Sequence, residues 1–113
     1  MASPDRVRED GLLTVRVEQD GGALVVRACG ELDLSSAKTL EEELRRAMGT
    51  DASAVVLDLG SLSFIDSTGL RALLVAAKLS QKNGRRLRMV RAPRALHRLL
   101  DVTGTERSLP LVD

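Results

Sequence analysis

The chain has 113 residues, of which 43% are hydrophobic and 29% charged, so we expect one globular domain, because domains usually span about 100–200 residues. Besides His97, Phe64 is the only aromatic ring, which excludes the ring platforms that stack on bases or sugars. The 17 Lys and Arg residues nearly balance the 16 Asp and Glu residues, and the net charge is +1. The total charge therefore supplies no strong single-sign field for a nucleic acid or a membrane.

The N-terminal segment 1–10 is polar and charged, and we expect it to be a flexible tail before a domain at 11–113. It has no apolar core, so no signal peptide is expected. No run in the chain approaches the roughly 20 apolar residues that span a bilayer. Cys29 is the single cysteine, which excludes an internal disulfide and a multi-cysteine metal site. These features favour a reducing, cytoplasmic setting.

The first predicted elements form a β-hairpin. Apolar residues alternate with polar ones over 13–18, which is the period of a strand with one solvated face. The segment 19–22 ends in Gly-Gly and predicts a tight turn. The apolar segment 23–29 predicts a second, more central strand, and we expect a break at 30–33.

Helices alternate with strands in the rest of the chain. Apolar residues at helical spacing predict the helices, caps and breakers mark their ends, and continuous apolar runs indicate buried strands. The first predicted helix is capped by Ser35 or Ser36 and ends at Gly49, and a strand follows at Ala54–Leu59. A short connection at Gly60–Ser63 leads to Phe64-Ile65 and to a second helix, which runs from Asp66 or Ser67 to Asn83-Gly84. The last elements are a strand at Leu87–Arg91, a helix with Pro93 in its first turn that ends at Thr103-Gly104, and an edge strand at Leu109–Val112.

The predicted order of elements is ββαβαβαβ. A helix between consecutive strands implies parallel crossovers, and the hairpin adds an antiparallel edge. We therefore predict an α/β fold with a mixed sheet of four to five strands. Because aromatic residues are nearly absent, leucine, valine, alanine and isoleucine must build the core.

The segment Phe64–Leu70 joins a predicted strand to a helix at the carboxyl edge of the sheet, where open α/β sheets place functional sites. Asp66, Ser67 and Thr68 all cap helices well, yet a helix needs only one or two such residues. Capping alone is one interpretation. The other is that a hydroxyl is displayed for modification. Gly69 supports display, because a glycine in a first turn is costly and permits close approach of another group.

No enzyme motif surrounds Ser67. The residues two before and two after it are not both glycine, so the Gly-x-Ser-x-Gly elbow is absent. His97 is the single histidine and is expected on a helix surface, which disfavours a Ser–His pair. Asp33 and Asp66 make a weak cation site without a histidine or cysteine cluster, and no Walker-type phosphate loop is present. We therefore expect a protein with no enzymatic activity, no metal and no bound cofactor.

Two further segments have open interpretations. Gly30–Asp33 is either a strand-end turn with Asp33 as a cap, or part of an acidic rim that includes Glu31, Asp33 and Asp66. A basic stretch is either a solvated face or an RNA-binding surface, although ring-stacking partners are missing. Its members are Lys82, Arg85, Arg86, Arg88, Arg91, Arg94 and Arg98.

The segments Gly30–Asp33, Val55–Leu59 and Asp66–Leu70 resemble those of the STAS domain, in particular the stand-alone anti-sigma factor antagonists of bacteria. The resemblance extends from about residue 12 to residue 111. It implies a mixed sheet with helices mainly on one face, and a phosphoprotein that regulates transcription by switching partners. Thr105 departs from the family, which often has an apolar residue after the late Thr-Gly.

The resemblance also implies partners and residue roles. An anti-sigma factor that is an ATP-dependent serine kinase would phosphorylate Ser67, and a PP2C-type phosphatase would remove the phosphate. The unmodified chain would bind the anti-sigma factor and thereby release a sigma factor. Asp66 would orient Ser67. The expected partner-binding residues are Glu31, Asp33, Asp66, Thr68 and Gly69.

An alternative role within the same family is a scaffold that does not switch, in a lipid-transport or sensory complex. In that case Ser67 would only cap its helix. For either role we expect a monomer or a weak dimer, with no nucleic acid or membrane among its partners.

Overall fold

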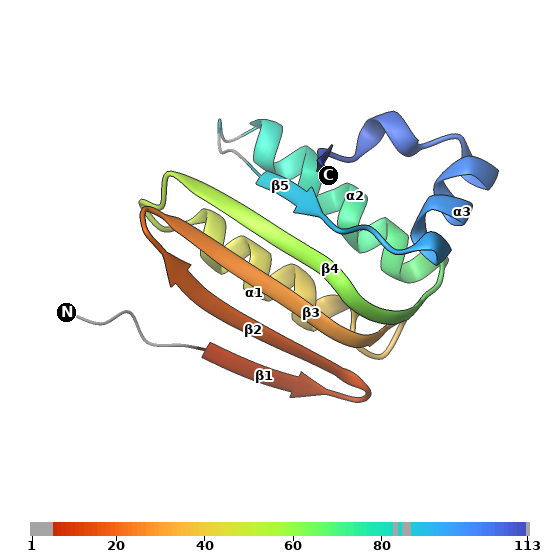
Figure 1. Ribbon diagram of the computed structural model, residues 1–113, viewed down its shortest axis with the longest axis horizontal. Coiled ribbons are helices and arrows are strands. Elements are labelled where there is room, and N and C mark those ends of the chain that lie inside the picture. The colour runs from red at the N-terminus through yellow and green to blue at the C-terminus, as the bar shows by residue number, and fades with distance from the viewer. Residues whose placement is uncertain (1–5, 83, 85–86, 113) are drawn as a thin grey trace.

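The computed structural model describes residues 6–82, 84 and 87–112. Within these residues the strands form one mixed sheet whose spatial order follows the chain, β1-β2-β3-β4-β5-β6 (Figure 1). Its first three strands are antiparallel and β3 to β6 are parallel. The elements are β1 (Arg6–Asp10), β2 (Leu13–Asp20), β3 (Ala23–Leu32), α1 (Ala37–Met48), β4 (Ala54–Ile65), α2 (Ser67–Lys82), β5 (Leu87–Val90), α3 (Arg94–Thr103), the 3₁₀ turn η1 (Glu106–Ser108) and β6 (Leu111–Val112).

The helices are the crossovers between the parallel strands. Because β3 to β6 advance in one direction across the sheet, right-handed crossovers place their helices on the same face. Figure 1 views the opposite, open face, with α1 and α2 behind the strands. The α/β class, the mixed sheet and the antiparallel hairpin edge are as predicted, with six strands in place of four to five.

The core lies between the sheet and its helices and is aliphatic. Alternate residues of the strands point into it, as the period-2 pattern of β2 predicts. The single phenylalanine does not belong to it, because Phe64 is 45% exposed. The fully buried side chains of the core include Leu13, Leu32, Leu40, Leu44, Leu57, Leu59, Leu73, Met89, Leu96 and Leu100.

The expected flexible tail at 1–10 is wrong for residues 6–10, which form the edge strand β1, so the sheet begins five residues before the predicted domain boundary. Residues 1–5 lie outside the described residues. Charged side chains stabilise this edge. Glu43 of α1 accepts hydrogen bonds from Arg6 and from Arg8, and Thr39 donates one to Asp10 at 2.6 Å. A search for apolar alternation misses a strand held by polar contacts.

The breaks expected at Gly30–Asp33 and Gly60–Ser63 are also wrong. β3 continues to Leu32 and β4 to Ile65, and the two strands stay paired through local register shifts. Gly30 makes one irregularity possible, since its φ is +106° and an added Cβ would lie 2.0 Å from a backbone oxygen of the neighbouring strand turn. Glycine inside a strand is typical of such bulges.

Smaller boundaries also move in the C-terminal half. β5 ends at Val90, one residue early, because Arg91 adopts a φ of +57°. Pro93 occupies the N-cap of α3 instead of its first turn. The predicted last strand is reduced to Leu111–Val112, and Asn83 lies outside the described residues. None of the helices in the described ranges is both long and apolar enough to cross a membrane.

The carboxylate of Glu43 fastens β1 to α1. Its side chain is 1% exposed, whereas those of Arg6 and Arg8 are 39% and 38% exposed. Burial alone would raise the pKa of Glu43, but hydrogen bonds from the two guanidinium groups outweigh burial and hold the pKa below its ordinary value. This contact therefore stabilises the fold only while the carboxylate is charged.

We expect Glu43→Gln to lower the free energy of unfolding by about 1–3 kcal/mol at neutral pH, because hydrogen bonds to a charged group are lost. The difference from wild type should be full above the ordinary carboxyl pKa and shrink as the pH falls through the lowered pKa of Glu43. Urea denaturation from pH 3 to pH 7 measures it. Glu42→Gln is the control, since Glu42 is 48% exposed and its ion pair within the described ranges is with Arg8. Equal effects of the two variants would contradict this account.

The first turn of α2 packs directly against the end of β3 at Gly69. A Cβ at this position would lie 2.6 Å from the backbone oxygen of Leu32 and 2.9 Å from Cγ1 of Ile65. Any side chain would therefore push α2 away from the sheet. Packing inside the fold therefore requires this glycine, and the close approach that it permits is to Leu32 and Ile65.

Gly69→Ala should destabilise the fold by about 1–3 kcal/mol, the usual cost of overpacking. Gly49→Ala is the matched control, because its φ is −84° and its added Cβ would meet ordinary contacts at 3.5 Å. We expect Gly49→Ala to change stability by no more than about 0.5 kcal/mol. Thermal denaturation of both variants tests this. If Gly69→Ala left the stability unchanged, α2 would be able to shift away from the sheet without loss of stability.

Candidate functional site

The carboxyl ends of β3 and β4 bring the two predicted motifs together. Leu32 pairs with Ile65 in the sheet, and the N–H of Asp66 donates to the carbonyl of Leu32 at 3.3 Å. Asp33 therefore follows β3 beside the point where Asp66 follows β4. This is the shared edge that the sequence predicts, and the edge at which open α/β sheets place their sites.

Asp66 caps α2. Its Oδ1 accepts the N–H of Gly69 at 2.9 Å, and its carbonyl accepts the N–H of Leu70 at 2.9 Å. The helix begins at Ser67, so the choice that the sequence left open between Asp66 and Ser67 falls to Asp66 as the cap. A side-chain oxygen on the third helical N–H is the usual N-cap bond.

Ser67 is left available by this arrangement. It is exposed at the first position of α2. Among the hydrogen bonds of the described residues, none involves its hydroxyl. Thr68 is half-buried and Gly69 is buried, so Ser67 presents the most accessible hydroxyl of the motif.

The loop between β3 and α1 holds Asp33 by hydrogen bonds from serine. Asp33 Oδ1 accepts the Ser35 hydroxyl at 2.7 Å and the Ser35 N–H at 2.9 Å. The Ser35 hydroxyl is the main reason that the pKa of Asp33 lies below its ordinary value. A charged carboxylate therefore stands at the same edge as Ser67.

The caps predicted for α1 are only partly correct. Ser36 occupies the N-cap position, but its side chain makes no cap bond to α1. Its hydroxyl accepts the N–H of Asp33 at 3.1 Å and donates to the carbonyl of Glu31 at 2.9 Å. The polar residues of this loop thus order the loop itself, a role that Ser and Asp side chains often take.

Exposed apolar side chains, which were not predicted from the sequence, accompany these polar groups. Leu12 is 69% exposed, Leu34 79% and Phe64 45%. Glu31 connects them, since it pairs with Phe64 in the sheet and its N–H donates to the carbonyl of Leu12 at 3.0 Å. Leu34 directly follows Asp33. Leu12 lies in the turn between β1 and β2, Leu34 in the turn before α1 and Phe64 in β4, so no shared pattern in the sequence marks them.

We call this surface the rim. It mixes carboxylates, one accessible hydroxyl and exposed apolar side chains, a combination typical of protein-binding surfaces. Its residues are Leu12, Glu31, Asp33, Leu34, Phe64, Asp66 and Ser67.

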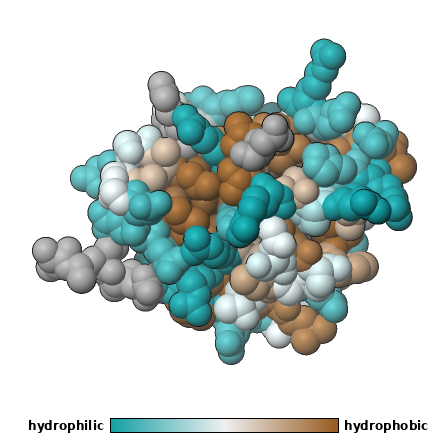
Figure 2. All heavy atoms as spheres, viewed as in Figure 1, coloured by the Kyte–Doolittle hydropathy of each residue, from teal (hydrophilic) through white to brown (hydrophobic). Residues whose placement is uncertain are grey.

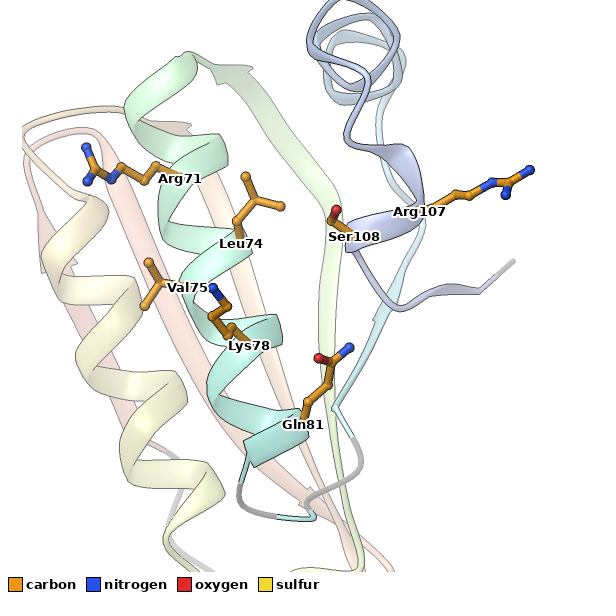
Figure 3. A pocket seen from close by; sticks show the side chains of 7 residues that line it. All are labelled: Arg71, Leu74, Val75, Lys78, Gln81, Arg107 and Ser108. Carbon is orange, nitrogen blue, oxygen red and sulfur yellow. The ribbon is translucent and has the colours of Figure 1, made fainter.

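Among the described residues, the groups considered for catalysis or metal binding do not come together at the rim. His97 is exposed on α3 and shares no hydrogen bond with Ser67. No group of three His, Cys, Asp or Glu side chains within the described ranges is arranged to hold a metal ion. A cavity of about 450 Å³ lies between α2 and η1 and is lined by Leu74, Gln81 and Ser108, among others (Figure 3). It includes none of the rim residues.

The basic stretch is distributed over several elements. Lys82 ends α2, Arg88 lies in β5, and Arg94 and Arg98 lie on α3, all exposed. Arg85 and Arg86 lie outside the described residues.

One member of the basic stretch is neutralised by an acidic side chain. Arg91 donates to both carboxylate oxygens of Asp58, at 3.0 and 2.5 Å. Figure 2 views the open face and shows hydrophilic and hydrophobic side chains interspersed across it.

Comparison with known proteins identifies the family. The family model of the STAS domain matches residues 14–113. The anti-sigma F factor antagonist of Paenibacillus polymyxa is 31% identical over 102 residues, which cover 89% of this chain and 87% of that protein. The anti-sigma-B factor antagonist of Bacillus subtilis is 32% identical over 92 residues, which cover 81% of this chain and 84% of that protein.

A solved structure supports the same family assignment. The crystal structure of an anti-sigma factor antagonist from Mycobacterium paratuberculosis superposes with a TM-score of 0.75 and 27% sequence identity, and the match covers 98% of this chain and 89% of that one. Sequence and fold agree over the strands and helices that build the rim. The chain therefore belongs to the STAS domain family, among the anti-sigma factor antagonists.

Proposed function

We propose that this chain is an anti-sigma factor antagonist controlled by phosphorylation of Ser67. In the unmodified state its rim binds an anti-sigma factor, which then releases a sigma factor. Phosphorylation of Ser67 ends this binding. The observation that carries the proposal is the separation of roles in the motif: Asp66 caps α2, and the exposed Ser67 hydroxyl makes no hydrogen bond among the described residues.

A change of local charge accounts for the switch without refolding. A phosphoserine adds about 1.5 to 2 negative charges, and the first turn of a helix accommodates an anion. The fold can therefore remain as it is. The rim changes, because the phosphate joins the carboxylates of Asp33, Asp66 and Glu31. A partner surface that fits the neutral hydroxyl meets bulk, tightly held water and added negative charge.

The chemistry of modification belongs to the partners. In the phosphorylation step the γ-phosphorus of ATP forms a bond to Ser67 Oγ, its bond to the β,γ-bridging oxygen breaks, ADP leaves, and a base of the kinase takes the hydroxyl proton. The anti-sigma factor supplies this kinase activity. A PP2C-type phosphatase then hydrolyses the phosphoserine. This chain acts as a cytoplasmic binding protein and carries no cofactor of its own.

Incubation with its anti-sigma factor and ATP should place one phosphate on Ser67, as mass spectrometry of the digested chain would show. Thr68→Ala should still accept the phosphate and Ser67→Ala should not, because Thr68 is the less accessible hydroxyl. Binding to the anti-sigma factor should be tight for Ser67→Ala and weakened at least tenfold for Ser67→Asp. Equal affinities of these two variants would refute the switch, and absence of phosphate would favour the scaffold role.

Capping and charge at Asp66 can be separated. Asp66→Ala should lower the free energy of unfolding by about 1 kcal/mol, because the Gly69 N–H loses its acceptor. Asp66→Asn keeps an acceptor oxygen, so it should lower the free energy of unfolding by only a few tenths of the loss caused by Asp66→Ala. Urea denaturation of the unmodified variants measures both. If Asp66→Asn were as unstable as Asp66→Ala, the carboxylate charge and not the cap bond would be the stabilising feature.

A further inference from the structure

The charged residues of α2 are all basic. The helix sequence STGLRALLVAAKLSQK carries Arg71, Lys78 and Lys82. Arg71 comes four residues after Ser67, one turn along the helix. Residues at this spacing lie on the same face, with their Cβ atoms about 5–6 Å apart.

The helical spacing of Arg71 suits contact with a group attached to Ser67. Each residue turns the helix by about 100°, so the two positions differ by about 40° around the axis and about 6 Å along it. Long side chains on a helix lean towards the preceding turn, which for Arg71 is the turn that begins at Ser67. Figure 3 shows Arg71 extended outward from the N-terminal half of α2, towards the side on which α1 lies.

In the part of the chain that the structure describes, no acidic side chain pairs with Arg71. It is exposed and takes part in none of the ion pairs found among the described residues. The paired arginines serve other parts of the fold. They are Arg6, Arg8, Arg27, Arg46 and Arg91.

We propose that Arg71 binds the phosphate of phosphorylated Ser67 within the same chain. This inference rests on the proposed function, because it requires the phosphate to be on Ser67. A guanidinium group matches two phosphate oxygens with paired hydrogen bonds. Arg71 thereby holds the phosphate over the first turn of α2, where the phosphate blocks binding of the partner.

Other charged groups near α2 either repel the phosphate or serve as controls for Arg71. Asp33 and Asp66 repel the phosphate from the rim. Lys78 lies on the same face of α2 but about 16 Å along the axis from Ser67. Lys38 is exposed in the first turn of α1, the helix packed beside α2. Either lysine removes the same charge when substituted, so both serve as controls.

The test measures the second ionisation of the phosphate. Phosphoserine is built into position 67 during synthesis of the full chain, so no kinase is needed, and ³¹P NMR follows the titration from pH 4 to pH 8. An ordinary phosphoserine has a second pKa of about 6. Arg71→Gln should raise this pKa by about 0.3, a twofold gain in proton affinity, as expected for the loss of an i,i+4 ion pair. Lys78→Gln and Lys38→Gln should leave it unchanged.

Two further measurements make the outcome decisive. Arg71→Lys should give an intermediate pKa, since charge is kept without the planar fork. The unphosphorylated Arg71→Gln chain should unfold at the wild-type temperature, because the side chain is exposed and unpaired. Equal pKa values in wild type and Arg71→Gln, or equal rises in all three glutamine variants, would overturn the role of Arg71. Neither result would affect the proposed function, which fails only if the kinase leaves Ser67 unmodified or binding ignores the phosphate.

Discussion

The parallel pairing of β3 with β4 is the constraint on which the rest of the structure depends. It brings Asp33 and Asp66, which are 33 positions apart in the sequence, to one edge of the sheet. The pairing persists to Leu32 and Ile65 only because glycine-containing irregularities absorb the register shifts. If both strands had ended at their first glycine, the motifs at Asp33 and Asp66 would lie in two separate loops and would not be held side by side by strand pairing. The strand extension is therefore as important to the site as the motif residues themselves.

Within the site, one residue's structural role frees another for function. Asp66 satisfies the helix terminus, so Ser67 needs no bond of its own. Gly69 lets the first turn of α2 lie against Leu32, which holds Ser67 in a fixed place at the edge. Hydrogen bonds from Ser35 lower the pKa of Asp33. The rim is thus preorganised by backbone and loop contacts, and its accessible hydroxyl is presented by a rigid element instead of a mobile loop.

The sequence predicted the α/β order, the aliphatic core and the polar motif at the carboxyl edge, because apolar periodicity and cap residues are local signals. It failed where a strand lacks an apolar pattern. The strand at 6–10 pairs with β2 across the turn at 11–12, and Arg6 and Arg8 add hydrogen bonds to Glu43, more than 30 residues away. The exposed leucines of the rim had no pattern to mark them. Local rules equally favoured Ser36 as a cap, whereas its hydroxyl bonds within the loop.

The near-neutral charge of the chain takes on a specific meaning at this site. A phosphate changes a net charge of +1 by about two units, yet its effect on binding depends on neighbours within a Debye length of about 8–10 Å. Those neighbours are carboxylates on the rim and a guanidinium on α2. With Ser67 phosphorylated as proposed, α2, whose charged residues are all basic, would hold the phosphate at its first turn, while the carboxylates of the rim present negative charge outward. Under the proposed function, the same fold would present two surfaces that differ in their affinity for one partner.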